Sequence, residues 1–378
     1  MKIAIVHDYL MQMGGAEKVV EHLHDIFPEA PIYTSAYDAR SMPDYFRTWD
    51  IRTSFLQKIL MKKHTHRAAL FLYPMAFESF DLSLYDVVIS SSSAFAKGVV
   101  TQPSTRHICY THTPMRFAWM TRAYMQNERI NRPLKALVAP GLHYLRMWDA
   151  TASQRVDRFV ANSSVVARRI NKFYHRDCDI LFPPVDTKRF AISKHIDNYY
   201  IIVSRLAPYK RIDLAVDAFT RLGIPLKVVG TGRQMRDLKR TAGDNVEFVG
   251  HVDDLILPEM IAHARGYVMP GEEDFGIAPV EANACGRPVI AYAAGGALDT
   301  QKDGETGVLF KEQTVNCLIN ALLRAENLKF DPQHLREHAR QFDSEVFSKE
   351  IKRILSEEII GEKAVIRSSV QIKDTFII

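Results

Sequence analysis

Two glutamates that flank a predicted helix start are the residues of this sequence best suited to chemistry. Glu273 lies in the stretch EEDFG, and Glu281 follows eight positions later in the stretch PVEANACG. We expect a helix to begin between them, because Pro279 suits a first helical turn and Gly286 suits the end of a helix. Backbone N–H groups at a helix start favour the negative end of a ligand. Here these groups belong to Phe275, Gly276 and Ile277.

Carboxylates beside an anion-binding helix start must recognise something other than the anion. A carboxylate accepts hydrogen bonds from hydroxyl groups, and a sugar offers several of them. Glu273 therefore suits a sugar, and Glu281 suits a vicinal diol such as a ribose. An anion with a polyol on each side describes a sugar nucleotide. The neighbouring Glu272 and Asp274 are interpreted as solvated charges that complement the helix dipole.

The same two glutamates allow two other interpretations. A pair of carboxylates could hydrolyse a glycosidic bond, but a glycosidase does not need the phosphate-ready loops described next. The acids could also hold a metal, but no histidine or aspartate is spaced to complete a ligand set. We therefore expect no metal ligands at this site.

Two loops that follow predicted strands could take a phosphate. In VSRLAPYKRID, Arg205 and Lys210 flank a turn at Pro208, and two cations on a rigid loop suit a diphosphate. They would otherwise be solvated cations, although cations at a helix N-terminus oppose the helix dipole. In HDYLMQMGGAEKVV, Gly14 and Gly15 precede a predicted helix and would let a ligand approach the backbone. A tight loop without a ligand explains the glycine pair equally well, and a dinucleotide fingerprint is absent.

Three further loops offer weaker candidates. The loop VVGTGRQ with Gly230 and the loop FVGHVDD with Val252 could each take the base or ribose of a nucleoside. Each is also an ordinary turn between a strand and a helix. In CYTHTPMRFAW, His112 stands at the carboxyl end of a predicted strand. A single histidine is usually structural, but this position favours a functional role.

Short β-branched runs alternate with helix-like stretches in both halves of the chain. The runs include KIAIVHDY, YDVVISSSSA and RHICYTHT in the first half, and YYIIVSRL, LKVVGTG and RPVIAYAAGG in the second. This alternation predicts an α/β protein with parallel sheets. The pattern occurs twice, and Pro183 and Pro184 favour a linker between the halves. We expect two Rossmann-like, doubly wound domains over 1–183 and 184–343, with ligands beyond the carboxyl ends of the strands.

Composition excludes several classes of protein. The chain of 378 residues is longer than one core usually spans, and no apolar run is long enough to cross a bilayer. The N-terminal MKIAIVHDYL is interpreted as a first strand rather than a signal peptide. The four cysteines show no ligand-like spacing, which is typical of reduced thiols in a cytosolic protein.

A basic and apolar segment suggests a surface partner. The formal charge is +5, and residues 51–77 carry five lysines and arginines without an acid. A second basic and apolar stretch lies within residues 122–146. Such segments suit an anionic membrane surface or a phosphorylated partner, although a solvated helix face over ordinary core explains them equally well. A nucleic-acid surface is not expected.

Taken together, these motifs resemble the retaining GT-B glycosyltransferases of family 4. Glu273 and Glu281 form the family's E-x7-E pattern within a stretch similar to its donor-binding helix. SRLAPYKR resembles the pyrophosphate loop, MGGAE resembles the glycine loop, and GETGVLF resembles the usual sequence after the donor site. The resemblance spans roughly residues 1–356. Arg211 departs from it, since many members have glycine there.

The resemblance implies a role for each candidate residue. It implies that Arg205 and Lys210 hold the diphosphate and that Glu281 holds the ribose. It further implies that Glu273 and the amides after it contact the transferred sugar, with His112 and the glycine loop near the reacting centre. No metal or other cofactor is implied. The last helix, predicted over about 344–355 within the segment 344–378, is expected to cross back onto the first domain.

The expected activity is transfer of a hexose with retention of configuration. YTHTPMRFAW resembles the mannosyltransferases that build lipid-linked repeat units of bacterial exopolysaccharide or O-antigen. GDP-mannose is thus the expected donor, and a polyprenyl-diphosphate saccharide at the inner face of the cell membrane is the expected acceptor. A UDP-hexose donor is the alternative, and a non-catalytic sugar-nucleotide-binding subunit is another. A phosphorylase of the glycogen type would need a pyridoxal lysine and a longer chain.

Overall fold

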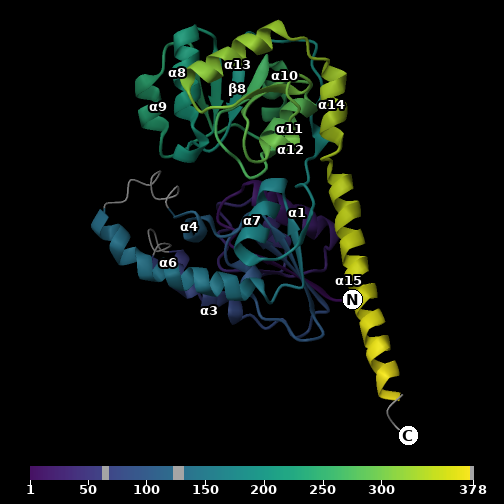
Figure 1. Ribbon diagram of the computed structural model, residues 1–378. Coiled ribbons are helices and arrows are strands. Elements are labelled where there is room, and N and C mark those ends of the chain that lie inside the picture. The colour runs from purple at the N-terminus through teal and green to yellow at the C-terminus, as the bar shows by residue number, and fades with distance from the viewer. Residues whose placement is uncertain (62–67, 122–131, 375–378) are drawn as a thin grey trace.

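The computed structural model describes residues 1–61, 68–121 and 132–374, and within them it contains two parallel β-sheets, one in each half of the chain (Figure 1). The prediction of two Rossmann-like α/β domains is therefore confirmed. Nine predicted strand segments each contain an observed strand. The prediction missed four short strands, at 32–34, 51–53, 178–180 and 307–310; the first three have only three residues, which are too few to show a period.

The first sheet has seven strands in the order β3-β2-β1-β4-β5-β6-β7. Its strands are β1 (Ile3–His7), β2 (Ile32–Thr34), β3 (Ile51–Thr53), β4 (Val87–Ser92), β5 (Arg106–Thr111), β6 (Arg158–Ala161) and β7 (Cys178–Ile180). Every residue of the central β4 is buried, as expected for a parallel strand covered on both faces. The helical elements around it are α1 (Gly15–Ile26), η1 (Asp44–Thr48), α2 (Gln57–Leu60), η2 (Ala68–Leu72), α3 (Tyr73–Glu78), η3 (Ala96–Gly98), α4 (Arg116–Trp119), α6 (Arg132–Ser153) and α7 (Ser164–Tyr174).

The second sheet has six strands in the order β10-β9-β8-β11-β12-β13. Its strands are β8 (Tyr200–Val203), β9 (Leu226–Val229), β10 (Val246–Gly250), β11 (Gly266–Met269), β12 (Val289–Tyr292) and β13 (Gly307–Phe310). The helical elements of this half are η4 (Thr187–Arg189), η5 (Pro208–Lys210), α8 (Ile212–Leu222), α9 (Met235–Thr241), α10 (Leu257–His263), α11 (Ile277–Ala284), α12 (Ala297–Thr300), α13 (Val315–Asn327), α14 (Pro332–Arg340) and α15 (Ser344–Asp374).

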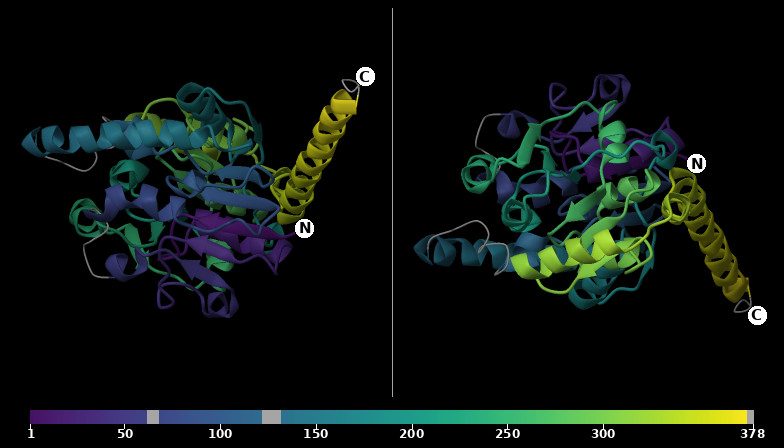
Figure 2. Two further views of the ribbon diagram at one scale, coloured as in Figure 1. Left: turned by 90° about the horizontal axis from the view of Figure 1, so that it is seen from below. Right: turned by 90° about the horizontal axis from the view of Figure 1, so that it is seen from above.

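Two chain segments pass between the halves, and they lie against each other. The N–H of Val185 donates to the carbonyl oxygen of Phe342 at 3.0 Å, and the N–H of Ser344 donates to that of Val185 at 3.1 Å. The second crossing leads into α15, whose Phe347 and Ile351 are buried with residues of the first sheet and α1. This helix extends further than the predicted 344–355 and projects from the body of the molecule (Figure 2).

Each sheet has one point where the strand order reverses. In the first sheet it lies between β1 and β4, and in the second it lies between β8 and β11. Neighbouring strands there send their helices to opposite faces, so the loops at their carboxyl ends part and leave room for a ligand. The loops that leave these four strands are therefore the first place to look for a site.

Candidate functional site

The loops after β8 and β11 bring together Lys210 and Glu273. Their strands pair in parallel, so both loops leave the same edge of the sheet. The Lys210 ammonium contacts the Glu273 carboxylate, and each side chain is less than one fifth exposed. A Cβ atom on Gly271 would lie 2.7 Å from the Lys210 backbone, so glycine is needed for this approach.

Lys210 carries a perturbed charge. Burial lowers the pKa of its ammonium to about 7, and the positive charges of Arg205 and Arg116 act in the same direction. The negative charge of Asp274 opposes this change. An anion bound among these cations would favour the protonated form of Lys210, so the loop suits a diphosphate.

The start of α11 lies beside this pair. Gly276 precedes the first helical residue with φ 91°, a conformation that favours glycine. The ring of Phe275 is buried and stacks on Phe182 at a centroid distance of 5.6 Å. The helix start is thereby fixed by a packed side chain, while its first N–H groups have no intrahelical acceptor.

The first domain meets this helix start with the start of another helix. Gly14 is the N-cap of α1, and a Cβ atom on Gly15 would lie 3.2 Å from Cδ1 of Ile277. From α1, the Lys18 ammonium reaches the almost fully buried carboxylate of Glu281 at 3.4 Å. The structure therefore brings the predicted Gly14, Gly15, Ile277 and Glu281 together across the domain boundary.

His112 ends a buried chain of polar groups. Its Nε2 lies 2.8 Å from Ser91 Oγ, and Ser91 Oγ lies 3.1 Å from Nδ1 of His7. Glu17 lies 3.7 Å from the other nitrogen of His7. Burial lowers the pKa of His112 to about 3, with a smaller effect from His7. His112 is therefore neutral near pH 7, and it can donate or accept one hydrogen bond at each nitrogen.

In the same chain of polar groups, the pKa of His7 is higher than that of an isolated histidine. Burial would lower its pKa, but the hydrogen bond and negative charge of Glu17 outweigh this and raise it. Sequence reasoning missed Glu17, His7 and Ser91, because three single polar residues in three elements show no common spacing. Their position directly after or within buried strands and α1 was the available signal.

Gly230 and Val252 both pack against other parts of the second domain. Gly230 has φ 119°, and a Cβ atom there would lie 2.1 Å from the carbonyl oxygen of Ser204. Val252 packs at the margin of the core that includes β11 and α11. Close packing of the loops after β8 and β9 thus explains the glycine, and contact of either residue with a nucleoside stays a prediction.

Asp274 is not the solvated charge that was predicted, since its side chain is only 16% exposed, whereas the side chain of Glu272 is 46% exposed as predicted. The guanidinium of Arg169, from the first domain, contacts Asp274 and lies 3.3 Å from Glu272. Arg116 lies 3.5 Å from Asp274 as well. These acids take part in contacts between the domains, which a pattern within one loop could not reveal.

Sequence reasoning also missed two residues that shape the site. The Asp8 carboxylate accepts hydrogen bonds from the backbone N–H groups of Ser93, Ala94, Phe95 and Ala96 at 2.5–3.0 Å, and thereby fixes the loop after β4. Gly295 has φ 61°, and a Cβ atom there would lie 2.1 Å from the carbonyl oxygen of Glu273. An acid directly after a first strand and the pair GG after a later strand were the signals.

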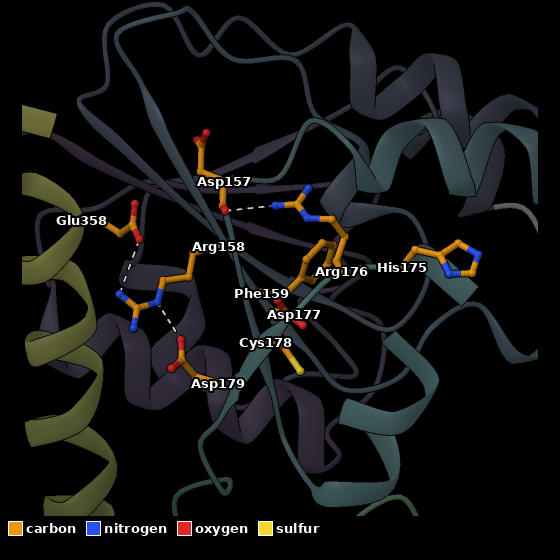
Figure 3. A pocket seen from close by; sticks show the side chains of 9 residues that line it. All are labelled: Asp157, Arg158, Phe159, His175, Arg176, Asp177, Cys178, Asp179 and Glu358. Carbon is orange, nitrogen blue, oxygen red and sulfur yellow. Dashed lines mark hydrogen bonds and ion pairs between the residues drawn. The ribbon is translucent and has the colours of Figure 1, made fainter. Parts of the chain in front are cut away.

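A cavity of about 510 Å³ lies elsewhere, at the amino ends of β6 and β7 (Figure 3). Its Arg158 already contacts Asp179 at 2.6 Å and Glu358 at 3.4 Å. Burial raises the pKa of the nearby Cys178 thiol to about 11, so the thiol stays protonated. The predicted site residues do not line this cavity.

Among the residues that the structure describes, one group of side chains has spacing that could hold a metal ion. It consists of His195, Asp197 and His263. His263 ends α10, at the edge of the sheet opposite to the loops after β8 and β11. The predicted sugar-nucleotide residues are not part of this group.

We compared this chain with known proteins, and it is similar to glycosyltransferases. A family model described as glycosyl transferases group 1 matches residues 185–342, which include the loops after β8 and β11. An uncharacterized glycosyltransferase of Methanocaldococcus jannaschii is 24% identical over 196 residues, which cover 50% of this chain and 56% of that protein. A GDP-mannose-dependent alpha-(1-6)-phosphatidylinositol monomannoside mannosyltransferase of Mycolicibacterium smegmatis is 32% identical over 170 residues, covering 37% and 44%. The chain thus spans about half the length of these curated relatives.

Solved structures resemble the whole chain. Alr3699/HepE of Anabaena, in complex with UDP and glucose, has a TM-score of 0.70 at 18% identity and covers 94% of this chain and 99% of its own. A sucrose-phosphate synthase of Thermosynechococcus elongatus has a TM-score of 0.73 at 18% identity, covering 96% and 100%. Identities this low show the fold alone, which is the GT-B fold. The family model and the curated relatives support a place among the group 1 glycosyltransferases.

Gly295→Ala tests how tightly the Glu273 loop is packed. We expect it to lower the free energy of unfolding by more than about 2 kcal/mol, since a left-handed φ and a clash with a backbone oxygen add together. Gly223→Ala is the matched control, because Gly223 has φ 67° with no atom within 4 Å of the added Cβ. It should cost about 1 kcal/mol. Equal costs in urea-unfolding experiments would show that the loop has room to move.

Proposed function

We propose that this chain transfers a hexose from a nucleoside diphosphate sugar to a sugar hydroxyl, with retention of anomeric configuration. One observation carries the proposal: cations, a helix start and two polyol-binding acids meet at the strand-order reversal of the second sheet. Arg205, whose Nη2 donates to the Tyr209 hydroxyl at 3.3 Å, and Lys210 suit the diphosphate, and the start of α11 adds its N–H groups. Glu273 and Glu281 lie beside it and suit the hexose and the ribose.

Donor binding would exchange partners at two ion pairs. A diphosphate beside Lys210 would replace Glu273 as the counter-ion, which frees that carboxylate to accept hydroxyl hydrogen bonds. A ribose diol on Glu281 would similarly compete with Lys18. Both acids are held in place before the donor arrives, so little reorganisation is required of them.

The catalytic contribution of this chain would be positioning and charge stabilisation. Arg205, Lys210 and the amides at the start of α11 would stabilise the departing diphosphate. Front-face attack assisted by the leaving phosphate is the route that we propose. Double displacement would need the Glu273 carboxylate as nucleophile, whereas we assign that group to the hydroxyls of the sugar. Neutral His112, on the facing domain, would hydrogen-bond a sugar hydroxyl through Nδ1, since its Nε2 is bonded to Ser91.

GDP-mannose is the donor that we propose. Support comes from the mycobacterial relative, which is named a GDP-mannose-dependent mannosyltransferase, and from the sequence YTHTPMRFAW. A UDP-hexose is the alternative, because the similar HepE structure contains UDP and glucose. A non-catalytic subunit that binds a sugar nucleotide would have the same site, and activity separates it from an enzyme.

We propose further that the acceptor is lipid-linked and that the first domain docks on the inner face of the cell membrane. No helix within the described residues is apolar and long enough to span a bilayer. Exposed apolar side chains instead project from η2, α3 and α6, which touch where Phe71 packs over Gly141. These side chains are Phe71, Leu72, Met75, Tyr144 and Met147. Lys58 is exposed on α2, whereas Lys62, Lys63, Arg67 and residues 122–131 lie outside the described residues.

A melting-temperature series with GDP, UDP, ADP and their sugars tests the function directly. A ligand at 100 times its dissociation constant stabilises the folded state by roughly 2.7 kcal/mol. We expect GDP and GDP-mannose to raise the melting temperature selectively, with or without Mg²⁺ and also in EDTA. Stabilisation by UDP compounds instead would keep the enzyme class and change the donor. Folded protein that responds to no nucleotide would contradict the proposed site.

Lys210→Ala tests the diphosphate site within a turnover assay. We expect kcat to fall by about 10²- to 10³-fold, because one preorganised charge at the leaving group is lost. Circular dichroism would confirm that the variant is folded. Lys329→Ala, an exposed lysine of the same domain, is the control and should retain wild-type turnover. Unchanged turnover in the Lys210 variant would remove that residue from the site.

Flotation with vesicles of phosphatidylglycerol and phosphatidylethanolamine tests the membrane proposal. We expect the wild-type chain to float, and we expect two variants to float less. One variant carries Met75→Ser and Met147→Ser, and the other removes the charges of Lys58, Lys62, Lys63 and Arg67. Leu255→Ser with Leu323→Ser removes two exposed apolar groups from the second domain and should have no effect. Wild-type protein that never floats would rule out this mode of docking.

A further inference from the structure

We propose, on the basis of the transferase function above, that Arg169 is a positioning residue that orients Glu273 when the two domains close. Arg169 lies on α7 of the first domain, and its side chain is 10% exposed. Its guanidinium contacts Asp274 and Glu272 of the second domain. It therefore holds both neighbours of the acid that we assign to the transferred sugar.

The alternation of side chains along the loop explains why holding the neighbours orients Glu273. The three consecutive acids of the loop divide their contacts between two cations. Glu272 and Asp274 both point towards Arg169, whereas Glu273 points towards Lys210. A rotation of the loop that moved Glu273 would have to break the contacts of its two neighbours.

The backbone of the loop is held from its other side. The carbonyl oxygen of Glu273 accepts a hydrogen bond from the N–H of Gly296 at 2.9 Å. Gly295 leaves no space for a Cβ atom against the same carbonyl group. The loop is therefore held on one side by the backbone of the second domain and on the other side by the Arg169 guanidinium.

Arg169 also contacts the loop of His112. Its Nη1 lies 3.3 Å from Oγ1 of Thr113, the residue that follows His112. The guanidinium of Arg169 therefore connects the loop that carries His112 with the loop that carries Glu273. Arginine suits this role because its planar fork can serve several oxygen acceptors at once with a fixed geometry.

The helix that carries Arg169 is firmly anchored in the first domain. At its C-terminal end, the hydroxyl of Tyr174 donates to the buried Asp149 at 2.8 Å. Asp149 also accepts from Nε1 of Trp119 at 2.6 Å and contacts the ammonium of the buried Lys97. The helix and the α4 segment therefore share one anchor, and they move together with the first sheet.

Two neighbouring contacts cross the domain boundary beside Arg169. The backbone N–H of Ser164, in the first turn of α7, donates to the Asp299 carboxylate of α12 at 2.9 Å. Figure 1 shows α7 directly below α12 at the boundary between the domains. Arg116 lies near Asp274, and its guanidinium lies 5.5 Å from the ring centre of Tyr209 in the diphosphate loop. These contacts lie at the domain boundary around the loop that carries Glu273.

The test compares Arg169→Gln with Arg168→Gln, its exposed neighbour on the same helix. We expect Arg169→Gln to lower kcat by about 10- to 100-fold, because a misplaced reacting group costs this much. The dissociation constant of GDP, or of whichever nucleoside diphosphate stabilises the protein, should change less than 3-fold. Asp274→Asn should give a similar loss, and the double variant should be little worse than either single variant. Arg168→Gln should retain wild-type kcat.

Hydrogen–deuterium exchange without nucleotide provides a readout that does not need turnover. We expect residues 272–277 and 113–119 to exchange faster in Arg169→Gln than in Arg168→Gln, because one anchor of both segments is lost. Wild-type protein that binds nucleotides but transfers no sugar would contradict the proposed function, and the exchange result would still test the coupling. Arg169→Lys keeps the charge without the fork, so it should fold and show an intermediate loss of kcat. Equal exchange and equal kcat in the Arg169 and Arg168 variants would overturn the proposal.

Discussion

The rest of the site depends on how the charges around Glu273 are balanced at the domain boundary. Its carboxylate contacts Lys210, and the acids on either side of it contact Arg169 of the other domain. Most of these charged side chains are less than one fifth exposed, so each needs a partner of opposite charge close by. The three consecutive acids of this loop therefore contact two different cations. Glu273 contacts Lys210, which we assign to the ligand, whereas Glu272 and Asp274 contact Arg169 of the facing domain.

This division has a consequence for ligand binding. The contacts of Glu272 and Asp274 with Arg169 do not involve the groups assigned to the donor, whereas those of Glu273 and Glu281 do. A diphosphate can therefore replace Glu273 at Lys210 while the Arg169 contacts persist. The ion pairs that hold the domains together and the ion pairs that give way to the donor are separate, although they lie on neighbouring residues.

Much of the fold and part of the site could be predicted from the sequence. Most strands of four or more residues show their pattern locally, although β13 was missed, and glycines and prolines at a helix start such as that of α11 are equally visible. The E-x7-E pattern, Arg205 and Lys210 were found in the same way, within single segments. Glu17, His7 and Ser91 could not be found so, because each belongs to a different element and the hydrogen bonds form only in the folded chain.

Arg169 shows most clearly why some site residues could not be predicted from the sequence. Its partners lie 103 and 105 positions later in the chain and in the other domain, and the sequence around it reads as an ordinary amphipathic helix. Arg211 is the opposite case, since its φ of 53° is a local backbone conformation that favours glycine. Local backbone constraints are visible in a sequence, whereas charge partners across a domain boundary are not.

The close backbone contacts also restrict how this site can move. Gly271 packs on the Lys210 backbone, and Gly295 packs on the Glu273 carbonyl group, so both loops are held against the second domain. On the other side, Asp8 and Asp149 hold the loops and helices near His112 against the first domain. The two paired segments at Val185 and Asp343 join these rigid halves. The Arg169 contacts with Asp274 and Thr113 then fix the Glu273 loop and the His112 loop relative to each other.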